Sequence, residues 1–596
     1  MREFSVPATA EVAPSDNLTD TVWAYAAGFP EHVAFSRPTA DGWRDVTARQ
    51  FCDDVAGVAK GLIAAGVQPG DRLALQSTTR YEWTVVDYAV WAAGAVTVPV
   101  YPTSSAEQVA WNLSDSGAVA VVVDSVEHEA VIQDVRGDLP ALRHLWQLDA
   151  GGLAELTRLG SEVPDALLER RRRTATADSL ATIIYTSGTT GRPKGCQLTH
   201  RNLLFTVLNA SGGLTRLFNP QGATLLFLPL AHVFARVIEA GAVVNRTRLG
   251  HTGDVTELVA DLGTFRPTFV LAVPRVFEKV YNVSRQRAHA EGKGAIFDQA
   301  ERVAVAYSHA VDEGRASLWL RIQHSVFDRL LYRRLRAALG GRCTSAISGG
   351  APLGERLGHF FRGIGLTVFE GYGLTETTAG SCLNLEGAIR IGTVGRPVPG
   401  VSVRIADDGE ILLAGETVFR GYWHDEAATA EAFTPDGWFR TGDLGELDDD
   451  GFLRITGRKK ELIVTASGKN VAPAVLEDRL RAHALISHCM VVGDAKPFVA
   501  ALVTIDPEAL PAWKRQHGKP DDASVADLRA DAELTAEIQR GVDQANQAVS
   551  HAEGIRKFAV LTDDFTEAGG ELTPSLKLRR SVVLERYAEE VAAIYG

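Results

Sequence analysis

The chain has 596 residues, of which 45% are hydrophobic and 23% charged, and its formal net charge is −13 at pH 7. This length is too great for one compact core, so we expect two or more domains with the composition of a globular protein. The acidic balance excludes a general nucleic-acid binder, because no basic surplus exists to neutralise a phosphate backbone.

The cysteines and the first residues indicate a cytoplasmic protein. The five cysteines are far apart and form no CxxC pair, which favours reduced thiols. The N-terminal stretch lacks the apolar core of a signal peptide. The most apolar segment, 83–101, contains Asp87 and Pro99, so we expect a buried helix followed by a strand rather than a membrane span.

Short apolar runs alternate with helix-length segments over the first two thirds of the chain. This alternation predicts an α/β fold with largely buried parallel sheets, in which ligands bind where strands end in loops. The runs are 95–101, 118–124, 180–185, 223–230, 268–274, 345–350 and 366–373.

The loop at 185–195, "YTSGTTGRPKG", follows one of these runs directly. Glycines let the backbone approach a ligand, and free N–H groups with serine and threonine hydroxyls suit a phosphate. The loop is not a Walker P-loop, because Gly191 is followed by Arg-Pro-Lys. By itself it would be a weak signal that turn chemistry also explains.

A basic, strongly helical segment covers about residues 280–342. Several apolar residues fall on one face at helical spacing, with arginines around them. We expect this stripe to pack on its own domain, and the alternative is a patch for anionic lipid headgroups. The stripe consists of Leu318, Ile322, Val326, Leu330 and Leu331, and the arginines are Arg321, Arg329, Arg333, Arg334 and Arg336.

The pattern changes after about Gly400. The stretches 401–415 and 445–458 each place an Asp-Gly turn between alternating apolar residues, which predicts hairpins. The charged run "GRKKE" at 457–461 then precedes a new pattern of strands and helices. We predict a domain boundary there.

Five further motifs occur in a fixed order: "SGGAPL" (348–353), "GYGLTET" (371–377), "RTGD" (440–443), "GRKKELIV" (457–464) and "ELTPSLKLRR" (571–580). With the glycine-rich loop they resemble the acyl-adenylating superfamily. Further stretches resemble its long-chain fatty acyl-CoA synthetase branch: "GVQPGDRLALQSTTRYEW" (66–83), "VPVYPTSSAEQ" (98–108), "PLAHVFARV" (229–237) and "VPRVFEKVYN" (273–282). The resemblance covers nearly the whole chain. It implies a large adenylate-forming domain of layered sheets and helices (1–456), a hinge (457–461) and a small mobile α+β domain (462–596).

The resemblance implies that a long-chain fatty acid is activated with ATP and Mg²⁺ to acyl-AMP, releasing pyrophosphate, and is then transferred to coenzyme A. A carboxylate about 4 Å from a phosphate charge repels it by about 4 kcal/mol at an effective dielectric of about 20, so cations and N–H donors are needed. One alternative is a fatty acyl-AMP ligase that serves an acyl carrier protein. Another is a non-catalytic lipid or nucleotide sensor, which should have lost Lys577, Glu376 or Asp443.

By resemblance, several residues hold the nucleotide. Glu376 would bind Mg²⁺ with Thr186, although a helix-start carboxylate is the alternative. Tyr372 would stack on adenine, unless it is an ordinary core tyrosine. The phosphate loop would use Thr186, Ser187, Gly188, Thr189, Thr190 and Lys194; the adenine slot Gly349, Gly350, Ala351, Pro352, Gly371, Gly373 and Thr375; and the ribose and hinge Asp443, Arg458 and Lys460.

The resemblance also implies the catalytic residues. Lys577 would bridge the substrate carboxylate and the α-phosphate, and His232 would line the carboxylate end, where a packing histidine is the alternative. Many family members have glycine before the lysine, whereas this chain has Leu576. The tryptophan that gates the acyl tunnel in some members is absent, which leaves Phe234 or Arg236 as the gate.

The resemblance implies that the small domain rotates at the hinge between the two steps, so that coenzyme A can enter where Lys577 stood. The segment 466–473, "ASGKNVAP", would then face the pantetheine channel. Peripheral membrane contact and a homodimer are hypotheses at this stage.

Overall fold

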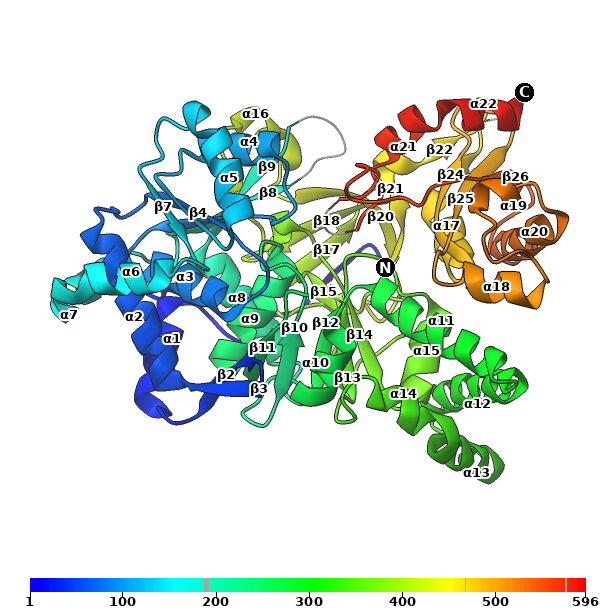
Figure 1. The fold of residues 1–596 in the computed structure, drawn as a ribbon, viewed down its shortest axis with the longest axis horizontal. Helices are drawn as coiled ribbons and strands as arrows, with labels where there is room; N and C mark the ends of the chain where they lie inside the picture. Colours follow the sequence, from blue (N-terminus) through cyan, green and yellow to red (C-terminus); the bar gives the residue numbers. More distant parts are fainter. Residues whose placement is uncertain (187–191, 255, 467, 574–575) are drawn as a thin grey trace.

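The computed structural model describes residues 1–186, 192–254, 256–466, 468–573 and 576–596. Two sheets with their helices and a smaller antiparallel sheet make up a large N-terminal domain. A smaller C-terminal domain, drawn from yellow to red, stands beside it (Figure 1). The predicted α/β class and the division into a large and a small domain are confirmed.

One sheet of the large domain has seven strands. Five neighbouring strands, which run as far as one edge of the sheet, are parallel and mostly apolar, as expected for strands covered on both faces. Two antiparallel strands close the other edge. In spatial order the strands are β19 (Gly421–Tyr422), β9 (Lys194–Thr199), β8 (Leu180–Thr186), β5 (Val96–Val100), β4 (Arg72–Gln76), β6 (Ala120–Val123) and β7 (His144–Gln147).

A second sheet of nine strands is parallel from β14 to β2 and antiparallel at both edges. It contains the runs predicted near 223–230, 268–274, 345–350 and 366–373. In spatial order the strands are β16 (Arg396–Pro397), β15 (Cys382–Leu383), β14 (Thr367–Tyr372), β13 (Ser345–Ser348), β12 (Phe269–Ala272), β10 (Ala223–Leu226), β11 (Arg248–His251), β2 (Val33–Thr39) and β3 (Gly42–Thr47).

Two helices in the core, α3 (Tyr81–Ala92) and α9 (Val233–Asn245), are buried on almost every side, which is typical of helices in the interior of a large domain. In α3 every residue except Glu82 is buried, and Asp87 lies among them, so the predicted buried helix before a strand is confirmed. The helices packed with the two sheets are α1 (Thr19–Gly28), α2 (Ala48–Ala64), α3 (Tyr81–Ala92), α4 (Ala106–Ser116), α5 (Val126–Asp134), α6 (Gly152–Leu159), α7 (Asp165–Arg172), α8 (His200–Ser211), α9 (Val233–Asn245) and α10 (Leu258–Phe265).

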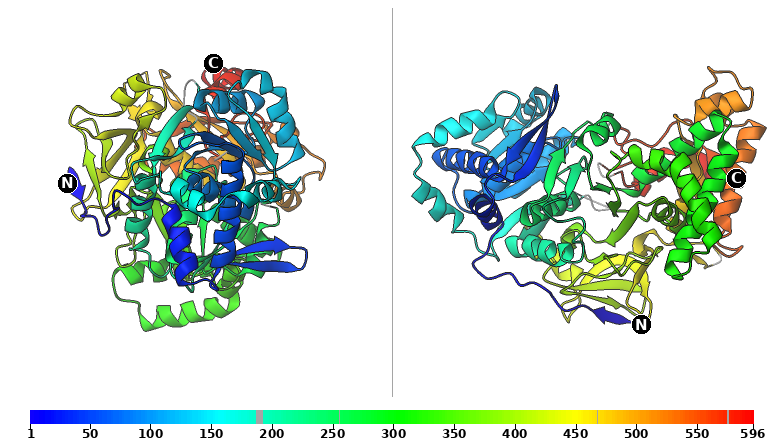
Figure 2. Two further views of the ribbon diagram at one scale, coloured as in Figure 1. Left: turned by 90° about the vertical axis from the view of Figure 1, so that its left-hand side faces the viewer. Right: turned by 90° about the horizontal axis from the view of Figure 1, so that it is seen from below.

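A third, fully antiparallel sheet follows Gly400 and contains both predicted hairpins. The N-terminal strand β1 pairs with β17, so the chain begins against residues some four hundred positions later (Figure 2). The strands are β1 (Glu3–Ser5), β17 (Val401–Ile405), β18 (Glu410–Gly415), β20 (Phe439–Leu447) and β21 (Leu453–Arg458), and the helix α16 (Glu426–Ala432) precedes β20.

A helical arm extends from the nine-stranded sheet. It consists of α11 (Pro274–Ala290), α12 (Gly294–Asp312), α13 (Leu318–Phe327), the π-helical turn η3 (Asp328–Tyr332), α14 (Arg333–Ala337) and α15 (Glu355–Gly363). The expectation that the apolar stripe of this segment packs on its own domain is wrong for four of its five residues, Leu331 being partly buried. The inner face of the helix uses other residues, including Phe327, which packs on the core of the arm.

The C-terminal domain combines a three-stranded sheet with helices and a short hairpin, as the predicted α+β pattern requires. Its sheet joins antiparallel and parallel neighbours. The elements are β22 (Ile463–Val464), β23 (Asn470–Val471), α17 (Pro473–Arg481), β24 (Ile486–Val492), β25 (Val499–Ile505), α18 (Leu510–Gln516), α19 (Val525–Leu528), α20 (Ala532–Asn546), β26 (Ile555–Val560), α21 (Arg580–Arg586) and α22 (Ala588–Tyr595).

Polar contacts tie this domain to the helical arm. Lys279 of α11 donates to Glu508 with 2.8 Å between Nζ and Oε1, and Arg275 donates to the Ser487 hydroxyl at 3.2 Å. In the described part of the chain, no helix is both long and apolar enough to cross a bilayer.

Candidate active site

A cleft of about 3000 Å³ lies between the two domains. Every predicted site residue within the described ranges lines it: Thr186, Lys194, His232, Gly349, Gly350, Ala351, Pro352, Gly371, Tyr372, Gly373, Thr375, Glu376, Asp443, Arg458, Lys460 and Lys577. The predicted Ser187, Gly188, Thr189 and Thr190 lie outside the described residues. The sequence motifs therefore meet in one place although they span most of the chain.

Asp443 is the centre of what we call the polar end of the cleft, made of Tyr372, Glu376, Asp443 and Arg458. Its Oδ2 accepts a hydrogen bond from the Tyr372 hydroxyl at 2.7 Å, and its Oδ1 accepts one from Arg458 Nε at 2.9 Å. The pairing of β20 with β21 brings Asp443 directly opposite Arg458. Each carboxylate oxygen keeps room for a further donor.

The turn after β14 requires glycine. A Cβ on Gly373 would lie 1.7 Å from the Ala379 carbonyl oxygen, so no larger residue fits without moving the backbone. Beside this turn, the loop after the neighbouring strand β13 is held by Glu370, whose carboxylate accepts a hydrogen bond from the Leu353 N–H at 2.9 Å. Together these contacts fix the spacing between Tyr372 and the 349–352 loop.

Glu376 lies in the short 3-10 turn η4 (Thr375–Thr377) and accepts a hydrogen bond from the Tyr422 hydroxyl at 2.9 Å. Lys194 stands above the Tyr422 ring, with Nζ 5.1 Å from its centroid. Thr186 and Glu376 both border the Cys196 thiol, so these two predicted metal ligands are brought together. Tyr422 was missed by the sequence analysis.

Lys577 is the residue of the C-terminal domain that lies near the charged groups of the polar end. Lys577 is exposed in the cleft, where desolvation by the surrounding protein and the Arg458 guanidinium lower the pKa of its ammonium, while Asp443 and Glu376 act in the opposite direction. The preceding Leu576 has φ of 59°, a left-handed conformation that glycine adopts more readily. This explains why glycine would suit the position.

His232 faces Lys577 from the large domain. Burial lowers the pKa of its imidazole to about 3, and the charge of Lys577 acts in the same direction. Its Nδ1 accepts the Phe234 N–H at 3.2 Å, so the neutral ring carries its proton on Nε2.

Beyond His232 the cleft becomes an apolar channel between α8 and α9, which we call the apolar end. A Cβ on Gly241 would lie 3.1 Å from the Phe218 ring, so the ring packs directly against this glycine. The lining includes Val207, Ala210, Ser211, Leu214, Phe218, Val233, Phe234, Val237, Ile238 and Gly241.

Of the two expected gate residues, only Phe234 lines the cleft. Arg236 is buried elsewhere. Its Nη2 lies 2.7 Å from Asp87 Oδ2, and its Nη1 donates to Thr182 at 2.8 Å. The expectation that Arg236 acts as a gate is therefore wrong, because this ion pair occupies its guanidinium.

The predicted hinge contains a contact that the sequence did not indicate. Lys459, in the short turn η5 (Lys459–Glu461), donates to Asp408 at 2.6 Å and to Glu410 at 3.1 Å. Lys460 is exposed at the edge of the cleft. Thus Lys459, rather than Lys460, forms the ion pairs between this segment and the large domain.

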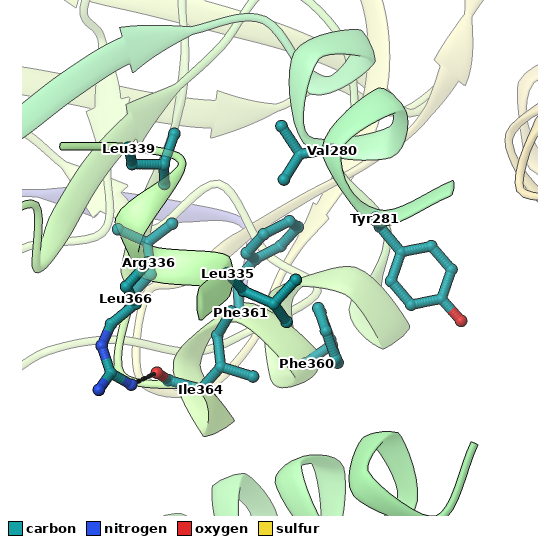
Figure 3. Close-up of a pocket in the computed structure, with 9 residues that line it drawn as sticks. All are labelled: Val280, Tyr281, Leu335, Arg336, Leu339, Phe360, Phe361, Ile364 and Leu366. Carbon is teal, nitrogen blue, oxygen red and sulfur yellow. Dashed lines mark hydrogen bonds between the residues drawn. The ribbon is translucent and has the colours of Figure 1, made fainter. Parts of the chain in front are cut away.

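Two further features lie in the helical arm. A cavity of about 10 Å³ between α11, α14 and α15 is lined mostly by apolar residues (Figure 3). This is about the smallest space that can hold one water molecule, so it is a packing gap.

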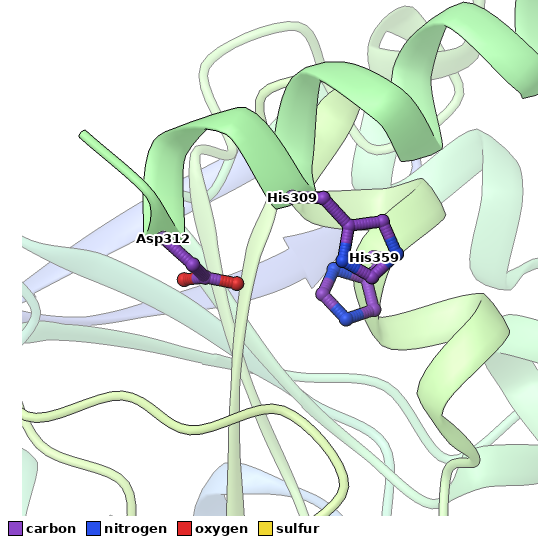
Figure 4. A group of neighbouring side chains, drawn as sticks. All are labelled: His309, Asp312 and His359. Atoms are coloured by element: carbon purple, nitrogen blue, oxygen red, sulfur yellow. The ribbon is translucent and has the colours of Figure 1, made fainter. Parts of the chain in front are cut away.

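A histidine cluster in the same arm brings nitrogen and oxygen atoms of His309, Asp312 and His359 within 4.8 Å (Figure 4). The centroids of the two imidazole rings lie 3.8 Å apart and their planes are tilted by 31°, so the rings face each other and their lone pairs, which lie in the ring planes, do not converge on one point. Asp312 is bound by Arg362 at 2.7 Å. We assign no metal site to this cluster, because its atoms are not arranged to hold a cation.

Comparison with protein families gives two matches that follow each other along the chain. A model described as AMP-binding enzyme matches residues 22–423, and one described as AMP-binding enzyme C-terminal domain matches residues 460–596. The long-chain-fatty-acid–CoA ligase FadD15 of Mycobacterium bovis is 54% identical over 100% of both chains. The long-chain-fatty-acid–CoA ligase ACSBG1 of Rattus norvegicus is 31% identical over 93% of this chain and 82% of its own.

Solved structures share the fold. The A domain of carboxylic acid reductase from Segniliparus rugosus, in complex with AMP and a co-purified carboxylic acid, matches with a TM-score of 0.75 and 21% identity, over 98% of this chain and 94% of its own. The anthranilate CoA ligase AuaEII, in complex with anthranoyl-AMP, matches with a TM-score of 0.72 and 20% identity, over 98% of this chain and 99% of its own.

Proposed function

The chain belongs to the AMP-binding enzyme family, and from this premise we propose that it is an ATP-dependent long-chain fatty acid–CoA ligase. The observation that carries this proposal is the meeting of Lys577 with His232, Glu376 and Asp443 across the domain boundary. A cleft with a polar end and an apolar channel suits a substrate pair of nucleotide and fatty acid.

We assign the polar end to ATP. Asp443 would accept both ribose hydroxyls on its remaining lone pairs, since Tyr372 and Arg458 hold the carboxylate in place. The Tyr372 ring, oriented by that hydrogen bond, would stack on adenine against Gly349, Gly350, Ala351 and Pro352. Arg458 and Lys194 would offset phosphate charge, together with the loop 186–194.

Thr186 and Glu376 would hold Mg²⁺. Their hydroxyl and carboxylate oxygens are the hard donors that this ion prefers, and the Tyr422 hydroxyl holds Glu376 through a single carboxylate oxygen. When bound, the ion would neutralise negative charge on the phosphates.

In the first step, a fatty acid carboxylate oxygen attacks the α-phosphorus and the bond to pyrophosphate breaks. Lys577 would bridge the carboxylate and the α-phosphate, stabilising the charge of the pentavalent centre. His232 is neutral and would donate its Nε2–H to the substrate carboxylate, so it orients the acid without transferring a proton.

In the second step, the coenzyme A sulfur attacks the acyl carbon and the bond to AMP breaks. This step requires Lys577 to leave, so the C-terminal domain would rotate about 457–461. The rotation would break the Lys279–Glu508 ion pair and the Arg275–Ser487 hydrogen bond. It would bring the segment 466–473, of which 467 lies outside the described residues, toward the pantetheine channel.

We assign the apolar end to the acyl chain. Burial of each methylene in such a channel is worth about 0.8 kcal/mol, so channel length sets chain preference. Phe234 would gate its entrance, since it lines the cleft between His232 and the 349–352 loop.

Mass spectrometry of products tests the proposal. Purified protein with Mg-ATP and a ladder of fatty acids should give acyl-CoA only when coenzyme A is present. Acyl-AMP that persists despite coenzyme A would instead indicate a fatty acyl-AMP ligase that serves a carrier protein, and no product at all would reject both ligase activities. A cytoplasmic location and a homodimer stay predictions from the sequence.

A further inference from the structure

The outer face of α13 carries an uncovered apolar stripe. Leu318, Ile322 and Val326 follow each other at four-residue steps, so they lie along one side of the helix, with Trp319 next to them. Leu330 follows in the π-helical turn η3. The exposed fractions are 75% for Leu318, 67% for Trp319, 47% for Ile322, 49% for Val326 and 56% for Leu330. Such a contiguous row differs from the single exposed apolar residues found on most surfaces.

The orientation of α13 is fixed by its inner face. His324 Nε2 donates to the Gly363 carbonyl at 2.7 Å, and its ring stacks on Tyr307 with centroids 3.9 Å apart. Just after the helix, the Tyr332 hydroxyl donates to the Ala300 carbonyl at 2.7 Å. The stripe therefore cannot turn inward. Figure 1 shows α13 at the lower right edge of the molecule, beyond α12.

Positive charge accompanies the stripe. Arg321, Arg329 and Arg334 are exposed, and no carboxylate of the described residues forms an ion pair with them. Arg333, in contrast, pairs with Asp328 at 3.1 Å. Since the whole chain has a net charge of −13, this is a local basic region on an acidic molecule.

We propose that α13 docks the protein on bilayers rich in anionic phospholipid. The apolar stripe would lie at the boundary of headgroups and acyl chains, Trp319 would sit at the interface, and the arginines would contact lipid phosphates. The choice of lipid as the occupant rests in part on the proposed function, because a long-chain fatty acid partitions into membranes. Docking would bring the cleft close to its apolar substrate.

A second copy of the chain fits this surface less well. A stable interface usually takes roughly 20–30 residues from each side, more than a ten-residue helix supplies. A two-fold contact through α13 would also bring unpaired arginines of both copies together. We treat self-association as an outcome of the test.

Co-sedimentation with vesicles, in the absence of substrates, tests the proposal. The stripe variant is L318S/I322S/V326S, and the charge variant is R321Q/R329Q/R334Q. The matched control is V126S/V259S/I296S, which changes three exposed apolar residues on other helices. All are compared on phosphatidylglycerol and phosphatidylcholine vesicles at low and high salt.

The wild type and the control should bind phosphatidylglycerol vesicles, more tightly at low salt. The stripe variant should lose at least about tenfold in apparent affinity, and the charge variant should lose the preference for phosphatidylglycerol. A wild type that does not sediment, or a stripe variant that binds like the control, would overturn the proposal.

Analytical ultracentrifugation of the same proteins covers the remaining outcome. A wild-type dimer that the stripe variant abolishes, without vesicle binding, would overturn the proposal in favour of self-association. Acyl-CoA formation from a dissolved acid should be equal in all variants. Because vesicle binding needs no substrate, failure of docking and failure of the ligase proposal remain distinguishable.

Discussion

At the polar end of the cleft, side chains hold each other through directed hydrogen bonds, whereas at the apolar end α8 and α9 leave a channel shaped by size alone. Tyr372 and Arg458 each donate a hydrogen bond to the Asp443 carboxylate, and Tyr422 donates one to Glu376. The channel instead depends on small residues such as Gly241. Changes at the polar end should therefore affect chemistry and nucleotide binding, and changes at the apolar end should affect which acid is chosen.

The largest effect is expected for Lys577→Ala. Removing a preorganised charged donor should slow acyl-AMP formation by at least about 10²- to 10³-fold. Transfer to coenzyme A from added acyl-AMP should stay within a few fold, because in the proposed cycle Lys577 leaves before that step. Lys496→Ala, an exposed lysine of the same domain beside Tyr595, is the matched control. Equal loss in both half-reactions would contradict the assigned role.

A smaller effect is expected for Asp443→Asn. A hydrogen bond to a charged group is worth about 1.5–3 kcal/mol, so the KM for ATP should rise about 10- to 100-fold. The KM for the fatty acid should change little, since Asp443 does not touch the channel. Steady-state kinetics with each substrate varied in turn separates the two values. An increase in the KM for the fatty acid alone would contradict the assignment of nucleotide binding to the polar end and acid binding to the apolar end.

The reverse pattern is expected for Gly241→Leu. The new side chain would crowd the Phe218 ring and narrow the channel that both residues line, so kcat/KM for a long acid should fall about tenfold or more. Values for a short acid and for ATP should stay within about threefold. Gly263→Leu is the control, because a Cβ there meets nothing within 4 Å. Unchanged chain preference would place the acyl chain elsewhere.

The sequence motifs indicated which residues meet at the polar end, because they sit at strand ends that open into one cleft, and the roles assigned to them stay predictions. The sequence did not indicate Tyr422, which is 46 residues from Glu376 in sequence. The Tyr422 hydroxyl reaches the Glu376 carboxylate because β19, which contains Tyr422, pairs with β9. The apolar end was not predictable in detail, since its residues have the same helical spacing as an ordinary core. For the same reason the stripe on α13 was expected to be buried.

The smallest effect is a change in the pH dependence of stability, and it concerns Glu239 on α9, the helix that forms one wall of the channel. Burial raises the pKa of Glu239 to about 8, with Asp87 acting in the same direction. Between about pH 5 and pH 8 the folded state therefore holds a proton that the unfolded state has lost, so the contribution of Glu239 to stability falls as pH rises.

Glu239→Gln should remove this loss of folding stability at higher pH, because glutamine does not ionise. Relative to the wild type, the variant should become more stable by about 1 kcal/mol or more between these pH values, as read from thermal unfolding curves. Glu107→Gln, an exposed glutamate on α4, is the control. Parallel pH profiles for the wild type and Glu239→Gln would show that the buried carboxyl does not titrate in this way.

Fatty-acid-dependent exchange of labelled pyrophosphate into ATP, measured without coenzyme A, tests the central claim most directly. Exchange reports reversible acyl-AMP formation alone, so it isolates the meeting of the polar and apolar ends in one cleft. We predict exchange that requires a long-chain acid and disappears in Lys577→Ala. Exchange with no acid of any length, or exchange that survives in Lys577→Ala, would contradict the account.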